Sequence, residues 1–573
     1  MARTKGDNRA GHGGYTRQNS TFVVAWFYTF DDGVVQASVN NWETVHGNAD
    51  FRTFAQPDAA FVGALVSGST TKQLASPTGT WTATLKGYVV GVLGKDHREW
   101  SEVVKDGDWV AIVVVKNGVA SLLMKGRVDN VGLNIHAGGN GEPDVSVTIT
   151  GRDVAAPAED TPVYWNPYDP LHASAIVGMP QILGPNARIA GRPDEVIPNL
   201  LLGLSGAAGT TFGHPPLVPA GVFGPDEVKW TDGILTSYVE KCRGLVFAPQ
   251  ILTTGSADSV WQFASQWLGP LNEMWIDTRS IDAGLRPGPA VITGTAPTSA
   301  FASATRDNGL LLRGSAHERA HSMGRGFLFM REKPFVNTAD QGKSPWFSLP
   351  NHVVSYGSVR GLSLSRGRNR VNHIQVLGEL PSSFGGDTMG LYAPVVDEGS
   401  IKRWGLRRLE RRTPYMAELD EGGSIAFSSE YRRWTELVVS WNCLNAEYWT
   451  GMVHLGELMP DIKVGQKLTL IHGPPIGFGG THGRTFPHDG GDPKKAMSFY
   501  VEAIQHTFNF GRTPQMETQI MVSRGYIEEK RAEDVLVAAS YFTQQGREST
   551  SSRNTLDGYD LLRETEDPDR GFA

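Results

Sequence analysis

The apolar and polar positions along the chain predict two β-rich regions separated by a mixed region. Residues 22–30 form an almost continuous apolar run that ends at Asp31-Asp32-Gly33, as in a strand buried on both faces. Residues 110–115 and 120–124 flank Asn117-Gly118, a pair that suits the positive φ angles of a tight hairpin turn. Further strands are predicted at residues 80–85, 127–135 and 145–150.

The middle of the chain, residues 161–347, has helical patterns between loops rich in glycine and proline. One helix is predicted from apolar residues spaced i, i+3, i+4, i+7 and i+8: Val260, Phe263, Ala264, Trp267 and Leu268. Pro193 suits the first turn of a second helix, although Pro198 weakens that prediction. The middle therefore reads as an α/β connecting region.

Strand patterns return in the last third of the chain, at residues 371–377, 467–471, 499–508 and 517–522. Two helices with aromatic faces are predicted between them. The first, at 400–410, places Ile401, Trp404 and Leu409 together, and the second, at 430–448, carries an aromatic stripe that we interpret as packing.

These patterns favour a β-rich α+β, multidomain protein. The expected organisation is an N-terminal arm (1–20), a first β-barrel domain (21–160), an α/β connecting region (161–347), a second β-barrel domain (348–530) with a helical insertion at about 398–450, and a polar C-terminal tail (531–573).

The two β-rich regions also resemble each other, which predicts an internal duplication. Each has a Gly-polar turn into a strand, at Gly107-Asp108 and at Gly465-Gln466. Each then has an alternating strand, and finally a strand that ends in arginine with glycine, at Gly151-Arg152 and at Arg524-Gly525. The order of the features is preserved as well as their content. Two Greek-key barrels without common origin would share some of them.

Composition excludes several classes of protein. The net charge is −7, so no general attraction to nucleic acid or to an anionic membrane is expected. The chain has only two cysteines, Cys242 and Cys443, which cannot build a disulfide framework. No apolar run reaches the ~20 residues needed to span a bilayer, and the start lacks the apolar segment of a secretory signal. We expect a soluble protein assembled in a reducing cytoplasm.

Four motifs, in order, resemble the central baseplate hub proteins of contractile bacteriophage tails and the related hub part of type VI secretion spike proteins. They are Gly107-Asp108-Trp109-Val110 with Gly126-Arg127-Val128-Asp129 and Thr150-Gly151-Arg152-Asp153; Tyr392-Ala393-Pro394 with Ser400-Ile401-Lys402-Arg403-Trp404-Gly405; Trp441-Asn442 with Pro460-Asp461-Ile462-Lys463-Val464-Gly465; and Tyr500-Val501-Glu502 with Ser523-Arg524-Gly525. They cover about residues 75–155 and 350–527.

This resemblance implies a homotrimer with two tail-tube-like antiparallel β-barrel domains per subunit. Such a hub joins the six-fold tail tube, or its initiator, to a three-fold central spike, contacts baseplate wedge proteins, and lets DNA pass without specific binding. We expect the strands at 127–131 and 501–506 to make ring-forming contacts, and a negative lumen would repel phosphates. The resemblance assigns no role to the arm 1–20, the loop 472–492 or the tail 531–573.

One motif favours an enzyme instead. His317-Glu318-Arg319-Ala320-His321 fits H-E-x-x-H, in which two histidines one turn apart bind zinc and the glutamate activates water. Arg319 places a cation beside the metal, and nearby glycines at 314 and 324 shorten the helix. Position 327 is Phe, where the extended form of the motif has His. A zinc metallopeptidase is therefore the alternative hypothesis, with a polar loop as the simpler interpretation.

Two other groups have simpler interpretations. His472, His482 and His488 lie near Asp489 and Asp492 in a Gly/Pro-rich loop, but their spacing fits no standard metal site. The second group is basic, and we interpret it as a solvated or subunit-contact face: Lys402, Arg403, Arg407, Arg408, Arg411 and Arg412. We therefore expect no catalytic, cofactor or metal site, and a structural virion protein. A distal tail ring protein is a further alternative.

Overall fold

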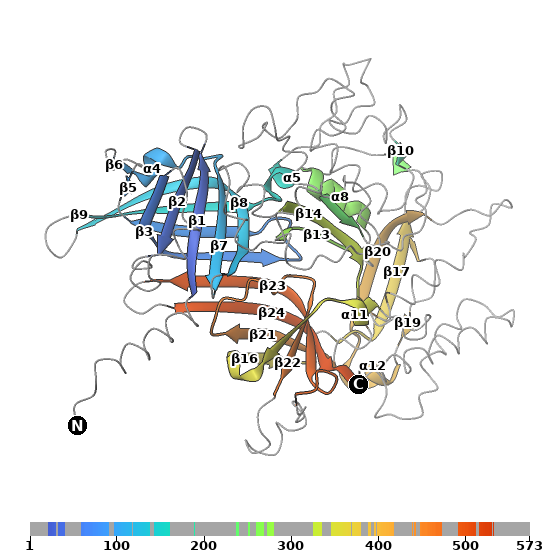
Figure 1. The fold of residues 1–573 in the computed structure, drawn as a ribbon. Helices are drawn as coiled ribbons and strands as arrows, with labels where there is room; N and C mark the ends of the chain where they lie inside the picture. Colours follow the sequence, from blue (N-terminus) through green and yellow to red (C-terminus); the bar gives the residue numbers. More distant parts are fainter. Residues whose placement is uncertain are drawn as a thin grey trace, which may run out of the picture.

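The computed structural model describes most of the two β-rich regions and parts of the region between them. The described residues are 21–29, 33–39, 59–86, 88–90, 97–116, 119–137, 143–160, 188–189, 236–239, 250–251, 259–268, 272–279, 325–334, 345–367, 370–379, 388–390, 395–396, 398–416, 438, 441–442, 447–472, 491–510, 515–529 and 531. Strands dominate these residues, so the prediction of a β-rich protein is confirmed. One 13-stranded sheet runs through both β-rich regions (Figure 1).

Seven strands of this sheet close into a ring, which we call the N-terminal sheet unit. They are β1 (Thr21–Thr29), β2 (Gly33–Val39), β3 (Ala59–Gln73), β4 (Thr80–Lys86), β7 (Trp109–Lys116), β8 (Val119–Ala137) and β9 (Pro143–Asp153). Their pairing order is β3-β2-β1-β7-β8-β9-β4 and back to β3. In β4, Trp81, Ala83 and Leu85 are buried and alternate with more exposed residues, so one face of the strand supports the core inside the ring.

Six further strands form the C-terminal sheet unit. They are β15 (Asn351–Ser355), β16 (Val359–Ser365), β21 (Trp449–Leu455), β22 (Lys467–Ile471), β23 (Met497–Asn509) and β24 (Gln515–Ile527). Their pairing order is β15-β22-β23-β24-β21-β16, and within the described residues β15 and β16 do not pair to close it. Val453, Leu468, Phe499 and Ile520 are fully buried in the core under this unit.

Many of the predicted strands are present. The predicted hairpin is β7–β8, with Val110 opposite Gly126 and Lys116 opposite Val119. The strands predicted at 467–471, 499–508 and 517–522 lie within β22, β23 and β24. The expectation of antiparallel barrels is wrong at two pairings, because β2–β3 and β15–β22 are parallel. Both connections are long, as parallel pairing requires, and alternation of side chains cannot reveal strand direction.

The two sheet units repeat the same strand order. In the N-terminal unit, β7, β8, β9, β4 and β3 are neighbours in that order and every pairing is antiparallel. In the C-terminal unit, β22, β23, β24, β21 and β16 are neighbours in that order, again with antiparallel pairings only. Both sets also follow the same order along the sequence, with β3/β16 first and β9/β24 last. The units therefore share connectivity as well as composition.

The turns that begin β7 and β22 are the same in detail. Gly107 and Gly465 both have positive φ, at 91° and 75°. Gly107 N donates to Val128 O and Val128 N to Asp108 O. Gly465 N donates to Val501 O and Val501 N to Gln466 O. The side chains of Asp108 and Gln466 accept from the backbone N–H three residues earlier, so glycine supplies the left-handed turn and the next residue caps it.

Two β-bulges also coincide in the repeat. Asp129 is the extra residue between Val128 and Asn130 where β8 pairs with β9, and Glu502 is the extra residue between Val501 and Ala503 where β23 pairs with β24. A second bulge also coincides. It lies between Leu65 and Ser67 in β3, and between Val359 and Gly361 in β16. The register that these bulges fix agrees across the strands of both units.

This register corrects one correspondence predicted from the sequence, the one between Arg152 and Arg524. Arg152 pairs with Arg127, next to the β8 bulge, and Ser523 pairs with Tyr500 at the corresponding place. Arg152 therefore corresponds to Ser523, and Arg524 has no equivalent place. Arg524 has a φ of 54° and lies in a further irregularity of the β23–β24 pairing, which shifts the arginine of the second motif by one residue.

A second layer of elements lies beside the C-terminal unit (Figure 1). It contains α8 (Val260–Leu268), β13 (Asn272–Arg279), β14 (Arg325–Glu332) and β11 (Thr236–Val239), with β14 between β13 and β11. The helix predicted from Val260 to Leu268 is thus present. The smaller elements of this part are α5 (Ala156–Asp160), β10 (Arg188–Ile189), β12 (Gln250–Ile251) and α11 (Pro345–Ser348). The helix predicted after Pro193 lies outside the described residues.

The insertion in the C-terminal region differs from its prediction. α12 (Glu398–Trp404) ends at Gly405, whose φ is 77° and whose N–H donates to Ile401 O. The next element is strand β20 (Arg408–Met416), which pairs with β17 (His373–Glu379). Leu409 therefore lies on a strand and does not share a helix face with Trp404. Of the helix predicted at 430–448, only 438, 441 and 442 are described as helical.

The remaining short elements complete the two regions. β17 also pairs with β18 (Thr388–Gly390) and β19 (Val395–Val396). Near the N-terminal unit, β5 (Tyr88–Val90) and β6 (His97–Glu99) form a small sheet followed by α4 (Trp100–Val103). The 3-10 helix η3 (Tyr356–Ser358) joins β15 to β16.

Candidate assembly site

The two sheet units are joined by an antiparallel pairing between β3 and β23. Seven residue pairs make this junction, from Gln73 opposite Ala503 to Ser67 opposite Asn509. Leu74 N donates to Glu502 O at one end and Phe510 N to Val66 O at the other. Figure 1 shows β3 and β23 side by side across the molecule. The junction makes the two units one continuous sheet.

Close packing holds the middle of the junction. Gly68 lies opposite Phe508, and a Cβ added at Gly68 would lie 2.5 Å from Phe508 Cζ and 2.5 Å from Thr82 O. Only glycine lets the Phe508 ring lie over the β3 backbone at this point. Phe508 is 1% exposed, so its ring is sealed inside the junction.

His506 is a buried polar group of the junction. Its Nδ1 lies 3.0 Å from Thr518 Oγ1. Thr518 Oγ1 donates its single hydrogen to Glu457 O and accepts from Met459 N, so Nδ1 of His506 must be the donor. Burial, with a smaller effect of Lys463, lowers the pKa of His506 to about 3. The ring is therefore neutral at pH 7.

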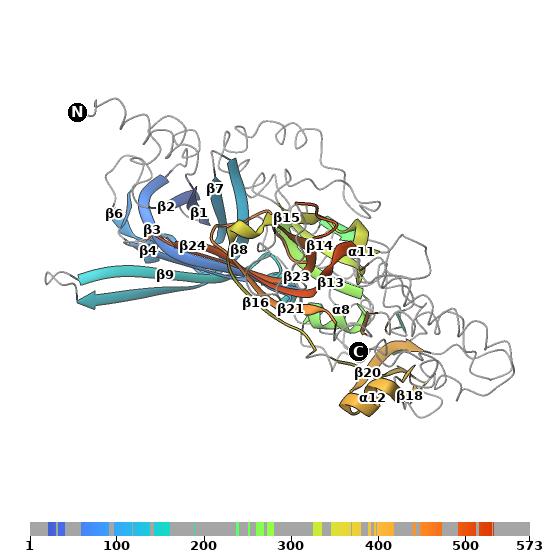
Figure 2. The ribbon, with the colours of Figure 1, turned by 90° about the horizontal axis from the view of Figure 1, so that it is seen from below.

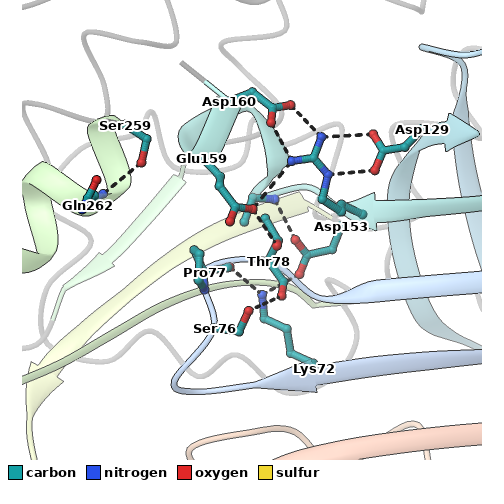
Figure 3. Close-up of polar contacts among 12 residues, drawn as sticks. Lys72, Ser76, Pro77, Thr78, Asp129, Asp153, Glu159, Asp160, Ser259 and Gln262 are labelled. Carbon is teal, nitrogen blue, oxygen red and sulfur yellow. Dashed lines mark hydrogen bonds and ion pairs between the residues drawn. The ribbon is translucent and has the colours of Figure 1, made fainter. Parts of the chain in front are cut away.

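An ion pair is buried where β3 leaves the junction (Figure 3). Lys72 Nζ donates to Asp153 Oδ2 at 2.5 Å and to Pro77 O at 3.1 Å. Asp153 Oδ1 accepts from Ala155 N at 3.0 Å. Burial raises the pKa of Asp153, and the charge of Lys72 opposes this rise. The pair ties β3 to the end of β9 from inside the N-terminal unit.

Arg152 forms a second ionic group with Asp129 and Asp160, which Figure 3 labels. Its Nε donates to Asp129 Oδ2 at 2.8 Å and its Nη1 to Asp160 Oδ1 at 2.6 Å. The hydrogen bonds that Arg152 donates to Asp129 and Asp160 raise its pKa, so it stays charged. In the repeat, Ser523 Oγ donates to Glu502 Oε1 at 2.5 Å. In both units, the acid at the bulge thus accepts from the residue that pairs two positions before it.

Several strands of the 13-stranded sheet have an open edge within the part of the chain that the structure describes, among them β8, β15 and β16. β7 pairs with β8 only as far as Arg127, so residues 130–137 of β8 pair with β9 alone. β16 pairs with β21 alone. Figure 2 shows the β8–β9 hairpin extending away from the rest of the N-terminal unit. Leu133 and Ile135 on this hairpin are 46% and 62% exposed, unusual for large apolar side chains on an edge strand.

A buried polar cluster attaches β13 and β14 to the C-terminal unit. Arg331 Nε donates to Glu273 Oε1 at 2.7 Å, and its Nη2 donates to Gly465 O at 2.5 Å and to Tyr500 Oη at 3.1 Å. Tyr500 Oη donates to Glu273 Oε1 at 2.6 Å. Burial, with the charge of Glu273, raises the pKa of Tyr500 well above its usual value. The phenol is therefore a permanent donor at physiological pH.

Glu528 accepts hydrogen bonds from several residues at the end of the C-terminal unit. It accepts from Lys467 Nζ at 2.8 Å, from Trp346 Nε1 at 3.1 Å and from Ser498 Oγ. Burial alone would raise its pKa, but the hydrogen bonds from Lys467 and Ser498 prevail and lower it. Arg531 lies 3.9 Å from the Trp346 ring centroid. These contacts are structural, because each polar group is directed at another part of the fold.

Most residues of the enzymatic hypothesis lie outside the described residues, including the whole H-E-x-x-H motif at 317–321. Of the histidine-rich loop, His472 and Asp492 are described, and His482, His488 and Asp489 are not. No group of metal-binding side chains occurs among the described residues. Cys242 and Cys443 also lie outside them.

The predicted basic group is divided between two elements. Lys402 and Arg403 lie on α12, and Arg408 and Arg411 on β20, all exposed, with Arg407 between the elements. Arg412 belongs to β20 by its backbone. Arg408 makes an ion pair with Glu410 at 3.1 Å. The exposure agrees with a solvated face.

The two strands expected to form ring contacts have different environments. Residues 503–506 are paired on both edges within the chain, by β24 and by β3, so this segment makes the internal junction. Residues 127–131 end at the point where the outer edge of β8 opens. The sequence pattern does not predict β16 as an edge strand, nor Gly68 and Phe508 as a packing pair. An apolar alternation at Val131, Leu133 and Ile135 was the available signal for the hairpin face.

Among the described residues, every helix is too short or too polar to cross a bilayer. No protein-family model matches the chain, and no curated protein matches it.

The chain is similar to solved structures of phage tail proteins and of a secretion component. A 43 kDa tail protein of prophage MuSo2 from Shewanella oneidensis aligns at 10% identity and a TM-score of 0.40, over 88% of this chain and 98% of that one. A tail protein from Neisseria meningitidis aligns at 10% identity and a TM-score of 0.38, over 82% and 95%. A type VI secretion component from E. coli, described as similar to bacteriophage T4 tail proteins, aligns at 7% identity and a TM-score of 0.35, over 83% and 76%.

Proposed function

We propose that this chain is a structural protein of a phage tail, the baseplate hub, and that it works as a homotrimer. The observation that carries the proposal is the repeat of five strands with the same order, direction and bulge register in one chain. Two such units per chain give three chains six units. A trimer can then match a six-fold tube on one side and a three-fold spike on the other.

The parts of the chain have separate roles in this proposal. The two sheet units, as tail-tube-like domains, form the ring that stacks on the tail tube or its initiator. The connecting region at 161–347 packs on the central spike. The insertion around α12 and β20, with its exposed arginines, faces baseplate wedge proteins. These roles follow from the ordered motifs of the sequence and from the attachment of β13 and β14 to the C-terminal unit through Arg331.

One face of the sheet suits the wall of a channel for DNA and the tape-measure protein. Across β3, β4 and β9, Ser69 lies opposite Thr82, and Thr82 opposite Thr150. In the C-terminal unit the corresponding row is Ser363, Met452 and Met521. These side chains are uncharged, so they offer phosphate groups no ion pair, and DNA can slide past them. We therefore propose that these rows form an uncharged channel wall, in place of the negative lumen that we expected.

The mass of the purified full chain in solution tests the proposal. The expected value is three times 62.3 kDa, about 187 kDa. Native mass spectrometry and light scattering over a range of concentrations measure it. A trimer supports the hub, whereas a hexamer would favour a distal tail ring. A strict monomer at high concentration, also with the spike partner present, would overturn the proposal.

A further inference from the structure

We propose that the open edge of β8 in one copy of the chain pairs antiparallel with the open edge of β16 in a second copy. The pairing repeats, between chains, the β3–β23 junction within the chain. This inference rests on the proposed function, because it specifies how three chains would join into a ring. It assigns residues to the contact, which the trimer alone does not.

The repeat determines which strands must pair. β3 of the N-terminal unit corresponds to β16, and β23 of the C-terminal unit corresponds to β8. Inside the chain, β3 pairs with β23. The same junction between units of different chains is therefore β16 with β8. Both strands have an open edge in the described part of the chain, as β15 also does.

The open edge of β8 also matches the paired edge of β23 in where it begins along the strand. On β23, the strand β22 occupies the first part of one edge, and β3 takes over from Glu502 onward. On β8, the strand β7 occupies the first part of the same edge, which is then unpaired from the bulge at Asp129 onward. The open segment of β8 thus begins at the residue that corresponds to the start of the internal junction.

The bulges give the register of the proposed pairing. Glu502 corresponds to Asp129, and the β3 bulge residue Val66 corresponds to Arg360. Transferring the internal register places Leu133 opposite Leu364 and Ile135 opposite Leu362. Asn134 then lies opposite Ser363, as Thr507 lies opposite Ser69.

This register pairs apolar residues with apolar residues. Leu133 and Ile135 are 46% and 62% exposed in the single chain. Leu362 and Leu364 are partly buried and pack on the core of the C-terminal unit. The pairing would cover the two exposed side chains and extend that core. A shift by one residue would turn Leu133 and Ile135 to the opposite face, so the apolar pattern itself selects the register.

The sizes of the paired side chains agree with the internal junction. There, the bulky Phe508 lies opposite Gly68, which has no side chain. At the corresponding place between chains, Ile135 lies opposite Leu362, so two medium side chains replace one large ring. Both pairs fill the space between strands at ordinary spacing.

The contact is head-to-tail, because each chain offers one β8 edge and one β16 edge. Such a contact closes into a ring when its rotation suits an integral number of copies. The internal junction sets this rotation for neighbouring units, and six units close the ring in three chains. The open edges of β8 and β16 are then paired, which removes two sites of uncontrolled sheet extension.

Engineered disulfides test the register. Asn134 and Ser363 are exposed and would face each other as a non-hydrogen-bonded pair, in which Cβ atoms lie close enough for a disulfide. The double variant Asn134→Cys/Ser363→Cys is expected to give, after mild oxidation, covalent dimers and trimers on a non-reducing gel and nothing larger. Mixing the two single variants is expected to give covalent dimers only.

Three controls make the result decisive. Ser69→Cys/Thr507→Cys places cysteines at the corresponding pair of the internal junction, and is expected to close a disulfide within one chain. The parent chain, with Cys242 and Cys443 alone, shows the background of oxidation. Asn134→Cys/Arg360→Cys moves one cysteine along β16 by three residues and is expected to give few covalent species.

The outcomes separate the inference from the proposed function. A trimer in solution that forms no Asn134–Ser363 disulfide, while the internal control closes, would overturn this pairing and leave the hub intact. Covalent species larger than trimers would confirm the pairing and contradict the closed trimer. A monomer without covalent species would overturn both.

Discussion

Asp129 and Glu502 occupy the same position in the two halves of the molecule. Each is the extra residue of a β-bulge, and each accepts a hydrogen bond from the strand opposite, Asp129 from Arg152 and Glu502 from Ser523. Yet Glu502 lies where β23 is covered by β3, and its pKa is raised by burial, whereas Asp129 lies where the edge of β8 opens. The strand edge beside this bulge is thus paired in the C-terminal sheet unit and open in the N-terminal sheet unit.

Gly68 is expected to be essential to the internal junction. Gly68→Ala would place a Cβ within 2.5 Å of Phe508 Cζ and of Thr82 O, and the backbone oxygen cannot move aside easily. We expect a loss of about 1–3 kcal/mol in the free energy of unfolding, as for overpacked cores. Thermal and denaturant unfolding measure the effect.

Gly357→Ala is the matched control for Gly68→Ala. The nearest atom to an added Cβ at Gly357 is Ser355 Oγ at 3.6 Å, an ordinary contact. The free energy of unfolding is expected to stay within about 0.5 kcal/mol of the parent. Equal effects of the two substitutions would contradict the packing described at the junction.

Lys72 is expected to compensate a buried carboxylate. Lys72→Met leaves Asp153 buried without its cation, which costs about 3–5 kcal/mol when a buried pair loses one partner. Because burial raises the pKa of Asp153, the folded protein holds its proton to higher pH than the unfolded chain. The stability gained by protonation is present at low pH and lost as pH rises.

The deficit of Lys72→Met relative to the parent is therefore expected to be smaller at pH 5 than at pH 8. Denaturant unfolding at both pH values measures it. Lys72→Met/Asp153→Leu, which removes both charges, is expected to recover part of the lost stability. A deficit that did not depend on pH would show that the charge of Asp153 is not the cause.

His506 is expected to make the fold sensitive to acid. Its pKa is about 3 in the folded protein and ~6.5 in an unfolded chain, so the unfolded state binds the proton first. Stability is complete above pH 6.5 and falls as pH falls toward 3. Between pH 7 and pH 5 this residue alone accounts for about 2 kcal/mol.

The variant His506→Asn keeps a donor near the Nδ1 position toward Thr518 but does not titrate. Its unfolding free energy is expected to depend less on pH than that of the parent between pH 7 and pH 5. Chemical denaturation at intervals of half a pH unit compares the two slopes. Identical slopes would rule out His506 as the titrating group.

Arg331 is expected to hold the connecting region against the C-terminal unit. Arg331→Met removes three hydrogen bonds and leaves Glu273 without its cation. We expect a loss of about 3–5 kcal/mol and faster proteolysis in the connecting region. Mass spectrometry of the early fragments locates the cuts. Arg408→Met, at an exposed ion pair, is the control and is expected to change neither property.

Ile135 is expected to act in self-association and not in folding. It is 62% exposed, so Ile135→Ser should leave the unfolding of the single chain almost unchanged. Its removal from the contact with Leu362 should weaken self-association at least tenfold, which analytical ultracentrifugation measures. Leu406→Ser is the control, because Leu406 is 59% exposed in the insertion and outside the proposed contact. Equal effects of both would point to unspecific hydrophobic association.

Much of the sheet could be predicted from the sequence, because alternation and turn residues are local signals. The Gly107 and Gly465 turns, the β7–β8 hairpin and β22 to β24 follow from such signals. The parallel pairings and the β3–β23 junction could not, because strand partners are set by contacts between distant segments. The helix predicted at 400–410 ended early because Gly405 takes a left-handed conformation, which a helical apolar spacing does not reveal.

The hairpin edge was partly visible in the sequence. Val131, Leu133 and Ile135 alternate with polar residues, which predicts one apolar face but not that this face lies outside a closed ring. The strand at 127–131 is predicted as a contact strand from the repeat, whereas its partner β16 is not predicted. Only the repeat in three dimensions relates the two edges.

A hub of this kind requires six equivalent sheet units in an assembly of three chains. Electron microscopy of the purified assembly, viewed along its axis, tests this most directly. We expect a ring of six similar densities with three-fold symmetry, in which alternate spacings correspond to the β3–β23 and β8–β16 junctions. A ring with six chains, a ring in which only three densities resemble each other, or no ring would contradict it.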